Sequence, residues 1–181
     1  MTATRNPNPD GEVFKHYVRD IPDFPQPGIL YRDITPLLGN PTAYRAVIDA
    51  LAAQYRDTAA EAIVAVESRG FMFGAPLAYV LGLPFITARK AGKLPYRSIS
   101  ASYALEYGEA TLEMHTDALT AGQRVLVVDD LLATGGTVLA TIDLVEQLGA
   151  TVLATAFVIE LTALHGRDRL TNYHPYALIQ Y

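Results

Sequence analysis

The chain has 181 residues, of which half are hydrophobic and 18% are charged, and its formal net charge is −5. This length and balance predict one globular domain with its own core, and the acidic charge disfavours a general nucleic-acid binder. The absence of cysteine excludes disulfides, thiolate metal sites and cysteine nucleophiles, and it leads us to expect a cytoplasmic protein.

The N-terminal end is polar and rich in proline and asparagine. We predict a flexible tail over residues 1–11 and a single domain over residues 12–181. The tail lacks the apolar core of a signal peptide, and no apolar run in the chain approaches the length of a membrane span. We therefore expect no membrane partner.

From residue 40 onward, helical and extended patterns alternate. Asn40 followed by Pro41 is typical of a helix start, and apolar residues then recur at helical spacing up to Tyr55. Helices are predicted over residues 41–55 and 71–81 and from 137 to the glycine at 149. Short strands are predicted over residues 63–66, 84–87, 100–106, 110–115, 125–128, 152–159 and 176–179. Residues 88–98 lack periodicity and are predicted to form a loop.

Strands that alternate with helices predict an α/β fold with a parallel sheet covered by helices on both faces. Ligands of such folds bind beyond the carboxyl ends of the strands. Glu67, Arg89, Asp129 and Glu160 each come at the end of a predicted strand. We expect these four side chains to converge on one edge of the sheet and form an active site.

The most informative run is Val-Leu-Val-Val-Asp-Asp-Leu-Leu-Ala-Thr-Gly-Gly-Thr, over residues 125–137. Adjacent carboxylates at 129 and 130 can accept hydrogen bonds from vicinal hydroxyls. Backbone N–H groups of the following turn, at the start of a helix, can bind a phosphate. The run therefore predicts a site for a phosphorylated ribose.

The run differs from two better-known phosphate-binding motifs. It lacks the lysine of a P-loop, and its adjacent glycines do not match the spacing of the dinucleotide-binding fingerprint. An ordinary strand–turn–helix capped by Thr134 or Thr137 would explain the threonines and glycines. It explains poorly why two charges sit side by side where a very apolar strand ends.

The run resembles the signature of the type I phosphoribosyltransferases, which bind 5-phosphoribosyl-1-pyrophosphate (PRPP). Six further stretches narrow the resemblance to the members of that family that use adenine, and they cover residues 24–28, 31–34, 67–71, 89–95, 105–108 and 160–162. The resemblance extends over residues 15 to 181. It implies a parallel twisted sheet flanked by helices, with a small N-terminal hood and a flexible catalytic loop.

The reaction implied by the resemblance is transfer of the 5-phosphoribosyl group from PRPP to adenine, which yields AMP and pyrophosphate in purine salvage. In this interpretation the ribose hydroxyls are bound by Asp129 and Asp130. The 5-phosphate is bound by the turn of Ala133, Thr134, Gly135, Gly136 and Thr137. Glycine at the centre of this turn lets the backbone approach the phosphate closely.

The pyrophosphate is assigned to the turn of Glu67, Ser68, Arg69 and Gly70. This turn follows a strand and presents backbone N–H groups, and the guanidinium of Arg69 supplies further donors. In this family the turn often contains a non-proline cis peptide. Three cations of the 88–98 loop, Arg89, Lys90 and Lys93, are assigned to the same group. The loop is either a solvated basic stretch or a lid that closes over the pyrophosphate and excludes water.

The adenine pocket is implied by the resemblance alone. Tyr31 would stack on one face of the base and Leu161 would cover the other face. The backbone C=O and N–H groups of Leu30 and Arg32 would form hydrogen bonds with the edge of adenine. The implied catalytic residues are Glu106 as acid or base, Arg89, Asp129 and Asp130. Tyr103 is a further candidate for the lid region. Magnesium is the expected cofactor, held mainly by PRPP and water rather than by a protein ligand set. A homodimer is expected, and whether Arg89 acts in its own subunit or the neighbouring one stays open.

Two alternatives stay open on the sequence. A PRPP-binding regulator of the same fold would carry an added basic DNA-binding segment, which this acidic chain does not show. A transferase for another nucleobase would share residues 125–137 and differ around Tyr31 and Leu161. A PRPP synthetase is disfavoured because it resembles two such domains in tandem.

Overall fold

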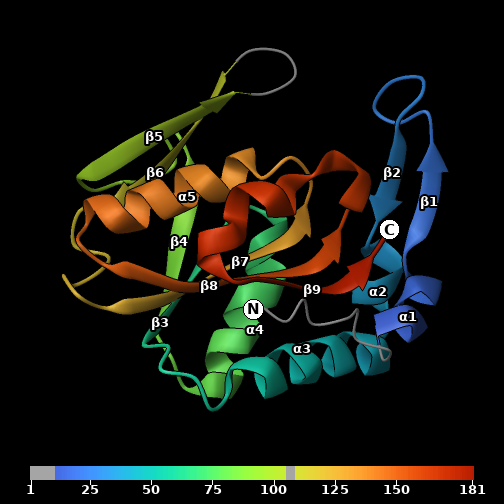
Figure 1. The fold of residues 1–181 in the computed structure, drawn as a ribbon, viewed down its shortest axis with the longest axis horizontal. Coiled ribbons are helices and arrows are strands. Elements are labelled where there is room, and N and C mark those ends of the chain that lie inside the picture. The colour runs from blue at the N-terminus through green and yellow to red at the C-terminus, as the bar shows by residue number, and fades with distance from the viewer. Residues whose placement is uncertain (1–10, 105–108) are drawn as a thin grey trace.

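The computed structural model describes residues 11–104 and 109–181, which form a central sheet with helices on both faces (Figure 1). The sheet has the strand order β5-β6-β4-β3-β7-β8-β9. Its strands are β3 (Ala62–Val66), β4 (Phe85–Lys90), β5 (Ser98–Ala104), β6 (Glu109–His115), β7 (Arg124–Leu132), β8 (Thr151–Glu160) and β9 (Pro175–Gln180). A separate two-stranded hood contains β1 (Arg19–Pro22) and β2 (Leu30–Asp33).

Helix α1 precedes the first strand, and the other helices lie between strands along the chain. They are α1 (Gly11–Phe14), α2 (Thr35–Gly39), α3 (Pro41–Tyr55), α4 (Arg69–Leu81) and α5 (Gly136–Gln147). Three short 3₁₀ segments complete the described chain, namely η1 (Lys15–Tyr17), η2 (Thr162–Leu164) and η3 (Gly166–Tyr173).

The pairing of the strands confirms the predicted α/β fold. The five strands β4, β3, β7, β8 and β9 pair in parallel. The hairpin β5–β6 adds an antiparallel extension at the β4 edge, and the hood strands β1 and β2 also pair antiparallel. The sheet is thus mixed but mostly parallel.

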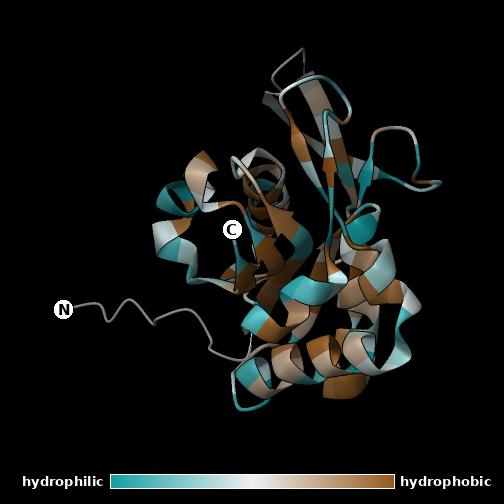
Figure 2. Ribbon diagram, turned by 90° about the vertical axis from the view of Figure 1, so that its right-hand side faces the viewer, coloured by the Kyte–Doolittle hydropathy of each residue, from teal (hydrophilic) through white to brown (hydrophobic). Residues whose placement is uncertain are grey.

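Successive side chains of the buried strands point to opposite faces of the sheet, so the hydrophobic core consists of two clusters, one on each face. On β3, Ile63 and Ala65 pack into the cluster that contains α3 and α4, whereas Ala62, Val64 and Val66 pack into the cluster that contains α5. All five residues of β3 are buried. Figure 2 shows hydrophobic residues gathered on the central strands, as expected for a sheet with helices on both faces.

Two strands extend further than the sequence pattern indicates. β7 continues through Asp129 and Asp130 to Leu132, because Leu131 and Leu132 still pair with Ile159 and Glu160 of β8. β4 continues to Lys90, because Arg89 and Lys90 pair with Glu113 and Leu112 of β6. The prediction of a loop over residues 88–98 was therefore wrong for its first three residues, and also for Ser98, which begins β5.

The hood is connected to the body of the protein through neighbouring residues of β2. The Arg32 guanidinium carbon lies 3.7 Å from the ring centre of Tyr181, the last residue, and Arg32 also forms an ion pair with Asp20 of β1. Tyr31 contacts the first turn of α4. Adjacent residues of a strand point to opposite faces, so β2 is held from both sides.

Among the described helices, none is both long enough and apolar enough to cross a bilayer.

Helix α3 provides a stability prediction. The Asn40 side chain accepts hydrogen bonds from the backbone N–H groups of Thr42 at 3.1 Å and Ala43 at 3.0 Å, which satisfies two groups that have no intrahelical partner. Asn40→Ala should lower the free energy of unfolding by about 1 kcal/mol in urea denaturation. Asn40→Asp keeps the acceptor oxygen and should retain most of the stability. An equal loss in both variants would contradict the capping role.

Candidate active site

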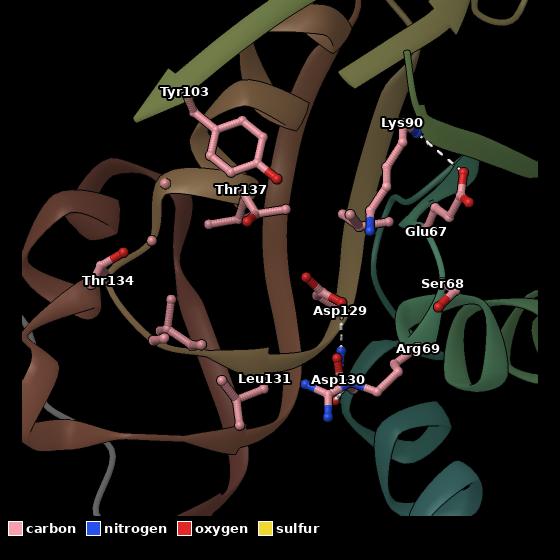
Figure 3. A pocket seen from close by; sticks show the side chains of 16 residues that line it. Glu67, Ser68, Arg69, Lys90, Tyr103, Asp129, Asp130, Leu131, Thr134 and Thr137 are labelled. Atoms are coloured by element: carbon pink, nitrogen blue, oxygen red, sulfur yellow. Dashed lines mark hydrogen bonds and ion pairs between the residues drawn. The ribbon is translucent and has the colours of Figure 1, made fainter. Parts of the chain in front are cut away.

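A cleft of about 360 Å³ opens where β3 ends and β7 continues. The parallel pairing of β3 with β7 stops at Ala65 and Val128, so the next residues of β7 have no strand beside them on that side and line the cleft. The cleft is lined by the 67–69 turn, by Lys90, by Tyr103 of β5 and by residues 129–138 (Figure 3). It therefore brings together segments that lie far apart in the sequence.

Two adjacent carboxylates form the floor of this cleft. Asp129 Oδ1 accepts a hydrogen bond from the backbone N–H of Asp130 at 2.9 Å. Burial raises the pKa of Asp129 well above the ordinary carboxyl value, and the neighbouring Asp130 raises it further. Burial also raises the pKa of Asp130, although Arg69 opposes this shift. The site therefore favours a cationic or hydrogen-bond-donating ligand beside these carboxylates.

Arg69, the first residue of α4, lies beside Asp130. Its Nε is 2.9 Å from Asp130 Oδ2, and this oxygen is fully buried. The two atoms are within ion-pair distance, but the oxygen has no partner with hydrogen-bond geometry among the described residues. Arg69 therefore offsets the charge of this carboxylate by proximity, while the oxygen itself remains without a hydrogen-bond donor.

The close approach of α4 to the carboxylates depends on Gly70. A Cβ atom at this position would lie 2.8 Å from Asp129 Oδ1 and 3.0 Å from the carbonyl oxygen of Val128. Any side chain would push the first turn of α4 away from β7. The peptide bond between Glu67 and Ser68 in the preceding turn is cis, a point that the sequence could not decide.

Glu67 orders this turn against the end of β4. Its Oε2 accepts hydrogen bonds from Arg89 Nε at 3.0 Å and from the Lys90 backbone N–H at 3.1 Å. Burial raises the pKa of Glu67, but these two donors outweigh burial and the pKa is lowered overall. Arg89 also donates from Nη1 to the Lys93 carbonyl oxygen. Glu67 and Lys90 line the cleft, whereas Arg89 and Lys93 do not.

The turn after β7 combines small residues with the start of α5. Residues 133–137 all line the cleft, and Gly135 caps the helix in the left-handed region at φ +83°. N–H groups in the first turn of a helix have no intrahelical partner, and they carry the positive end of the helix dipole. N–H groups placed in this way can bind an anion, and the phosphate assignment of this turn stays a prediction.

The 3₁₀ segment η3 supports this turn from behind, and the sequence analysis did not identify it. A Cβ on Gly166 would lie 2.1 Å from the carbonyl oxygen of Ala133 and 3.0 Å from the Gly135 nitrogen. Arg169 Nη1 donates to the carbonyl oxygen of Thr134 at 3.0 Å. These contacts join residues more than thirty positions apart, so no local pattern could have revealed them.

Of the four strand-end residues expected to converge, Glu67 and Asp129 line the cleft, Arg89 contacts Glu67 without lining the cleft, and Glu160 does not line it. The Glu160 carboxylate is buried and accepts hydrogen bonds from Arg167 at 2.8 and 2.5 Å and from Gln180 at 2.9 Å. Burial raises the pKa of Glu160, but these donors outweigh it and lower the pKa overall. Glu160 therefore anchors η3 and does not line the cleft.

The four residues assigned to adenine are not among the lining residues of the cleft. Tyr31 is half-buried and accepts a hydrogen bond from Arg69, while Leu30 is exposed. The Arg32 side chain is engaged by Asp20 and Tyr181. Leu161 is partly buried against the hydrophobic core. Glu106, the predicted acid or base, lies outside the described residues.

Two further lining residues are uncharged. Leu131 forms an apolar part of the cleft wall between the carboxylates and the turn of residues 133–137, and Tyr103, a candidate from the sequence, projects from the hairpin β5–β6 (Figure 3). The period-two alternation of a strand, which places residues 129 and 131 on one face, is a signal that could have identified Leu131.

The chain matches known proteins over most of its length. The phosphoribosyl transferase domain family matches residues 35–176. An adenine phosphoribosyltransferase from Carboxydothermus hydrogenoformans is 60% identical over 92% of this chain and 98% of its own.

Solved structures give the same match. The adenine phosphoribosyltransferase of Thermoanaerobacter pseudethanolicus superposes with a TM-score of 0.92 at 49% identity, covering 94% of this chain and 99% of that chain. The Saccharomyces cerevisiae enzyme, solved with an imino-altritol bisphosphate and adenine, gives a TM-score of 0.88 at 41% identity, covering 93% of this chain and 98% of that chain.

The raised pKa of Asp129 predicts a pH-dependent cost to the ligand-free protein. A carboxyl whose pKa is raised on folding lowers stability as the pH rises above its unfolded value of about 4. Asp129→Asn should therefore stabilise the protein relative to the unsubstituted chain, with a difference that grows from pH 4 towards neutrality. Urea denaturation at a series of pH values measures this difference.

Asp49→Asn is the matched control for this prediction, because Asp49 is an exposed carboxylate on α3. Its stability difference should not follow the same trend with pH. A gain at Asp129→Asn that stays constant across the pH range would show that burial of the charge is not the cause.

Proposed function

The chain belongs to the phosphoribosyl transferase family, and we infer from this membership and from its cleft that it is an adenine phosphoribosyltransferase. It transfers the 5-phosphoribosyl group of PRPP to adenine and releases pyrophosphate, so that AMP is formed in purine salvage. The observation that carries this conclusion is the cleft itself, where paired carboxylates, an anion-binding turn and a cationic turn surround one space.

The reaction breaks the bond between C1 of the ribose and the pyrophosphate oxygen, and it forms a bond between C1 and a ring nitrogen of adenine. The nitrogen loses a proton, and positive charge builds on the sugar as the leaving group departs. The protein must therefore hold the ribose, stabilise charge on both sides of C1 and place the base in line.

We assign the ribose hydroxyls to Asp129 and Asp130. The position of both residues in the cleft lining and the raised pKa of both carboxyls support this assignment, because a hydroxyl donor and a developing positive charge would each stabilise the ionised form. We assign the 5-phosphate to residues 133–137, where the first turn of α5 supplies N–H donors.

We assign the leaving pyrophosphate to the turn of residues 67–70 together with Lys90. Arg69 supplies a planar set of donors at the mouth of the cleft, and Lys90 lies across from it. Arg89 and Lys93 are proposed to act indirectly, since Arg89 holds Glu67 and the carbonyl oxygen of Lys93. Glu106 remains our candidate for the proton transfer at adenine.

Magnesium fits this site as a companion of the substrate. No cluster of three metal-binding side chains occurs among the described residues, but the adjacent carboxylates with raised pKa could hold a cation through substrate oxygens and water. When bound, the ion would neutralise part of the charge of PRPP. We propose that it is held mainly by PRPP and water.

The substrate assignment is tested by turnover with PRPP and Mg²⁺ against adenine, hypoxanthine, guanine and uracil. AMP formation should exceed the product from each other base by at least about 100-fold, because a site built to bind an amine leaves its polar groups unpaired with a carbonyl. Activity with guanine and none with adenine would overturn the base assignment. Retained PRPP binding without turnover on any base would favour a regulator.

We also propose a homodimer that uses the outer face of α4. Met72, Tyr79 and Val80 of this helix are exposed large hydrophobic residues, and Tyr79 is 88% exposed. Exposed apolar patches of this kind mark association surfaces. Because α4 begins at Arg69, a partner on this face would lie close to the cleft.

Sedimentation velocity tests the dimer. The unsubstituted chain should sediment as a dimer at micromolar concentration, and Tyr79→Asp should shift it towards the monomer. Val13→Asp is the matched control, since Val13 is 60% exposed on α1, away from this face. A monomeric unsubstituted chain, or equal shifts in both variants, would contradict the proposed interface.

A further inference from the structure

Tyr31 uses its ring and its hydroxyl for different contacts. Phe24 packs edge-on against the ring, with the two ring centres 5.1 Å apart and an interplanar angle of 78°. The hydroxyl oxygen accepts a hydrogen bond from Arg69 Nη1 at 2.5 Å. The guanidinium carbon of Arg69 lies 5.4 Å from the ring centre, within the range of a cation–π contact. A phenylalanine would keep the ring contacts and lose the hydrogen bond.

Arg69 is consequently held at two points from two different elements. Its Nε lies 2.9 Å from Asp130 Oδ2 on β7, and its Nη1 donates to Tyr31 on β2. A guanidinium is planar and has five N–H donors, so the ion pair and the hydrogen bond fix its plane and leave further donors for a ligand. The Arg69 side chain remains 32% exposed and lines the cleft, so these donors can reach an anion there.

We propose that the Tyr31 hydroxyl is a positioning group for Arg69 and thereby contributes to binding of the leaving pyrophosphate, in addition to any contact of the ring with the base. This inference rests on the proposed function for the identity of the anion. Tyr31 thus connects the hood to the pyrophosphate turn, across 38 positions of sequence.

The physical basis is preorganisation. A free arginine side chain loses several rotatable bonds when it binds an anion, and a side chain already fixed by two partners loses fewer. Removal of the Tyr31 hydroxyl leaves Arg69 anchored at Asp130 alone. The affinity for pyrophosphate should then fall, whereas the stacking face offered to adenine is unchanged.

A different role would give different results. If the hydroxyl only fastened the hood to the body of the protein, its removal would lower thermal stability and raise the KM for both substrates together. If the hydroxyl positions Arg69, only the binding of pyrophosphate and of PRPP should weaken. A comparison of the KM for PRPP with the KM for adenine therefore distinguishes positioning from structural support.

The test is Tyr31→Phe, with the dissociation constant of inorganic pyrophosphate measured by calorimetry in the presence of Mg²⁺. We expect the constant to rise roughly fivefold, the size expected for one hydrogen bond of about 1 kcal/mol. The KM for PRPP should rise by a similar factor, while the KM for adenine stays within about twofold. An unchanged pyrophosphate affinity would overturn the proposal, as would an equal rise in both KM values.

Tyr44→Phe is the matched control. The Tyr44 hydroxyl also donates to helix α4, at the carbonyl oxygen of Met72, but it does not contact Arg69. Its removal should leave the pyrophosphate affinity unchanged even where it lowers the melting temperature. A loss of affinity equal to that of Tyr31→Phe would show that disturbance of α4 is the cause.

A second variant tests whether Tyr31 acts through Arg69. In an Arg69→Lys background the bond from Nη1 no longer exists, so adding Tyr31→Phe should produce little further loss of pyrophosphate affinity. Additive losses would overturn the mechanism. Pyrophosphate binding requires no turnover, so a chain that fails to form AMP would contradict the proposed function and leave this test intact.

Discussion

The site depends on the burial of two neighbouring carboxylates on β7, at the point where β3 has stopped. Adjacent charged residues are unusual in a parallel strand, because helices cover both faces of the sheet and both side chains would be buried. Here Asp129 and Asp130 are tolerated because the pairing of β3 with β7 ends at Val128 and the strand beyond it borders a cleft. The opening in the sheet and the chemistry of the site therefore have the same structural origin.

The surrounding elements compensate for these charges. Arg69 provides the nearest positive charge, and Gly70 allows the helix that carries it to approach Asp129. Compensation in the ligand-free protein is incomplete, since the pKa values of both carboxyls remain raised. A site that stays strained in this way gains more from a ligand with hydroxyl donors than a fully satisfied site would.

The local parts of this arrangement could be predicted from the sequence. Residues 125–137 combine an apolar strand, two charges and a glycine-rich turn within one short run, and each part has a distinct composition. The extension of β4 through Arg89 and Lys90 could not be predicted, because it results from pairing with β6. Glu160 was misassigned for a similar reason, since its partners Arg167 and Gln180 meet it only in the folded chain.

The adenine residues show where sequence reasoning depends on resemblance alone. Nothing in the pattern around Tyr31 distinguishes a base-stacking ring from any other aromatic side chain. The contact with Arg69 gives this residue a physical role that the sequence pattern did not indicate. The role of a hood residue depends on its contacts with the body of the protein, and those contacts join segments that are far apart in the sequence.

The packing of Gly166 against the phosphate turn has a consequence for the order in which the site can form. The signature residues 129–137 are complete well before the chain reaches η3, yet the turn takes its shape against Gly166 and Arg169. A nascent chain that ends before this segment would contain the whole signature and lack the backing that shapes its anion-binding turn. We therefore expect such a shortened chain to bind the anion poorly until residues 166–169 have been added.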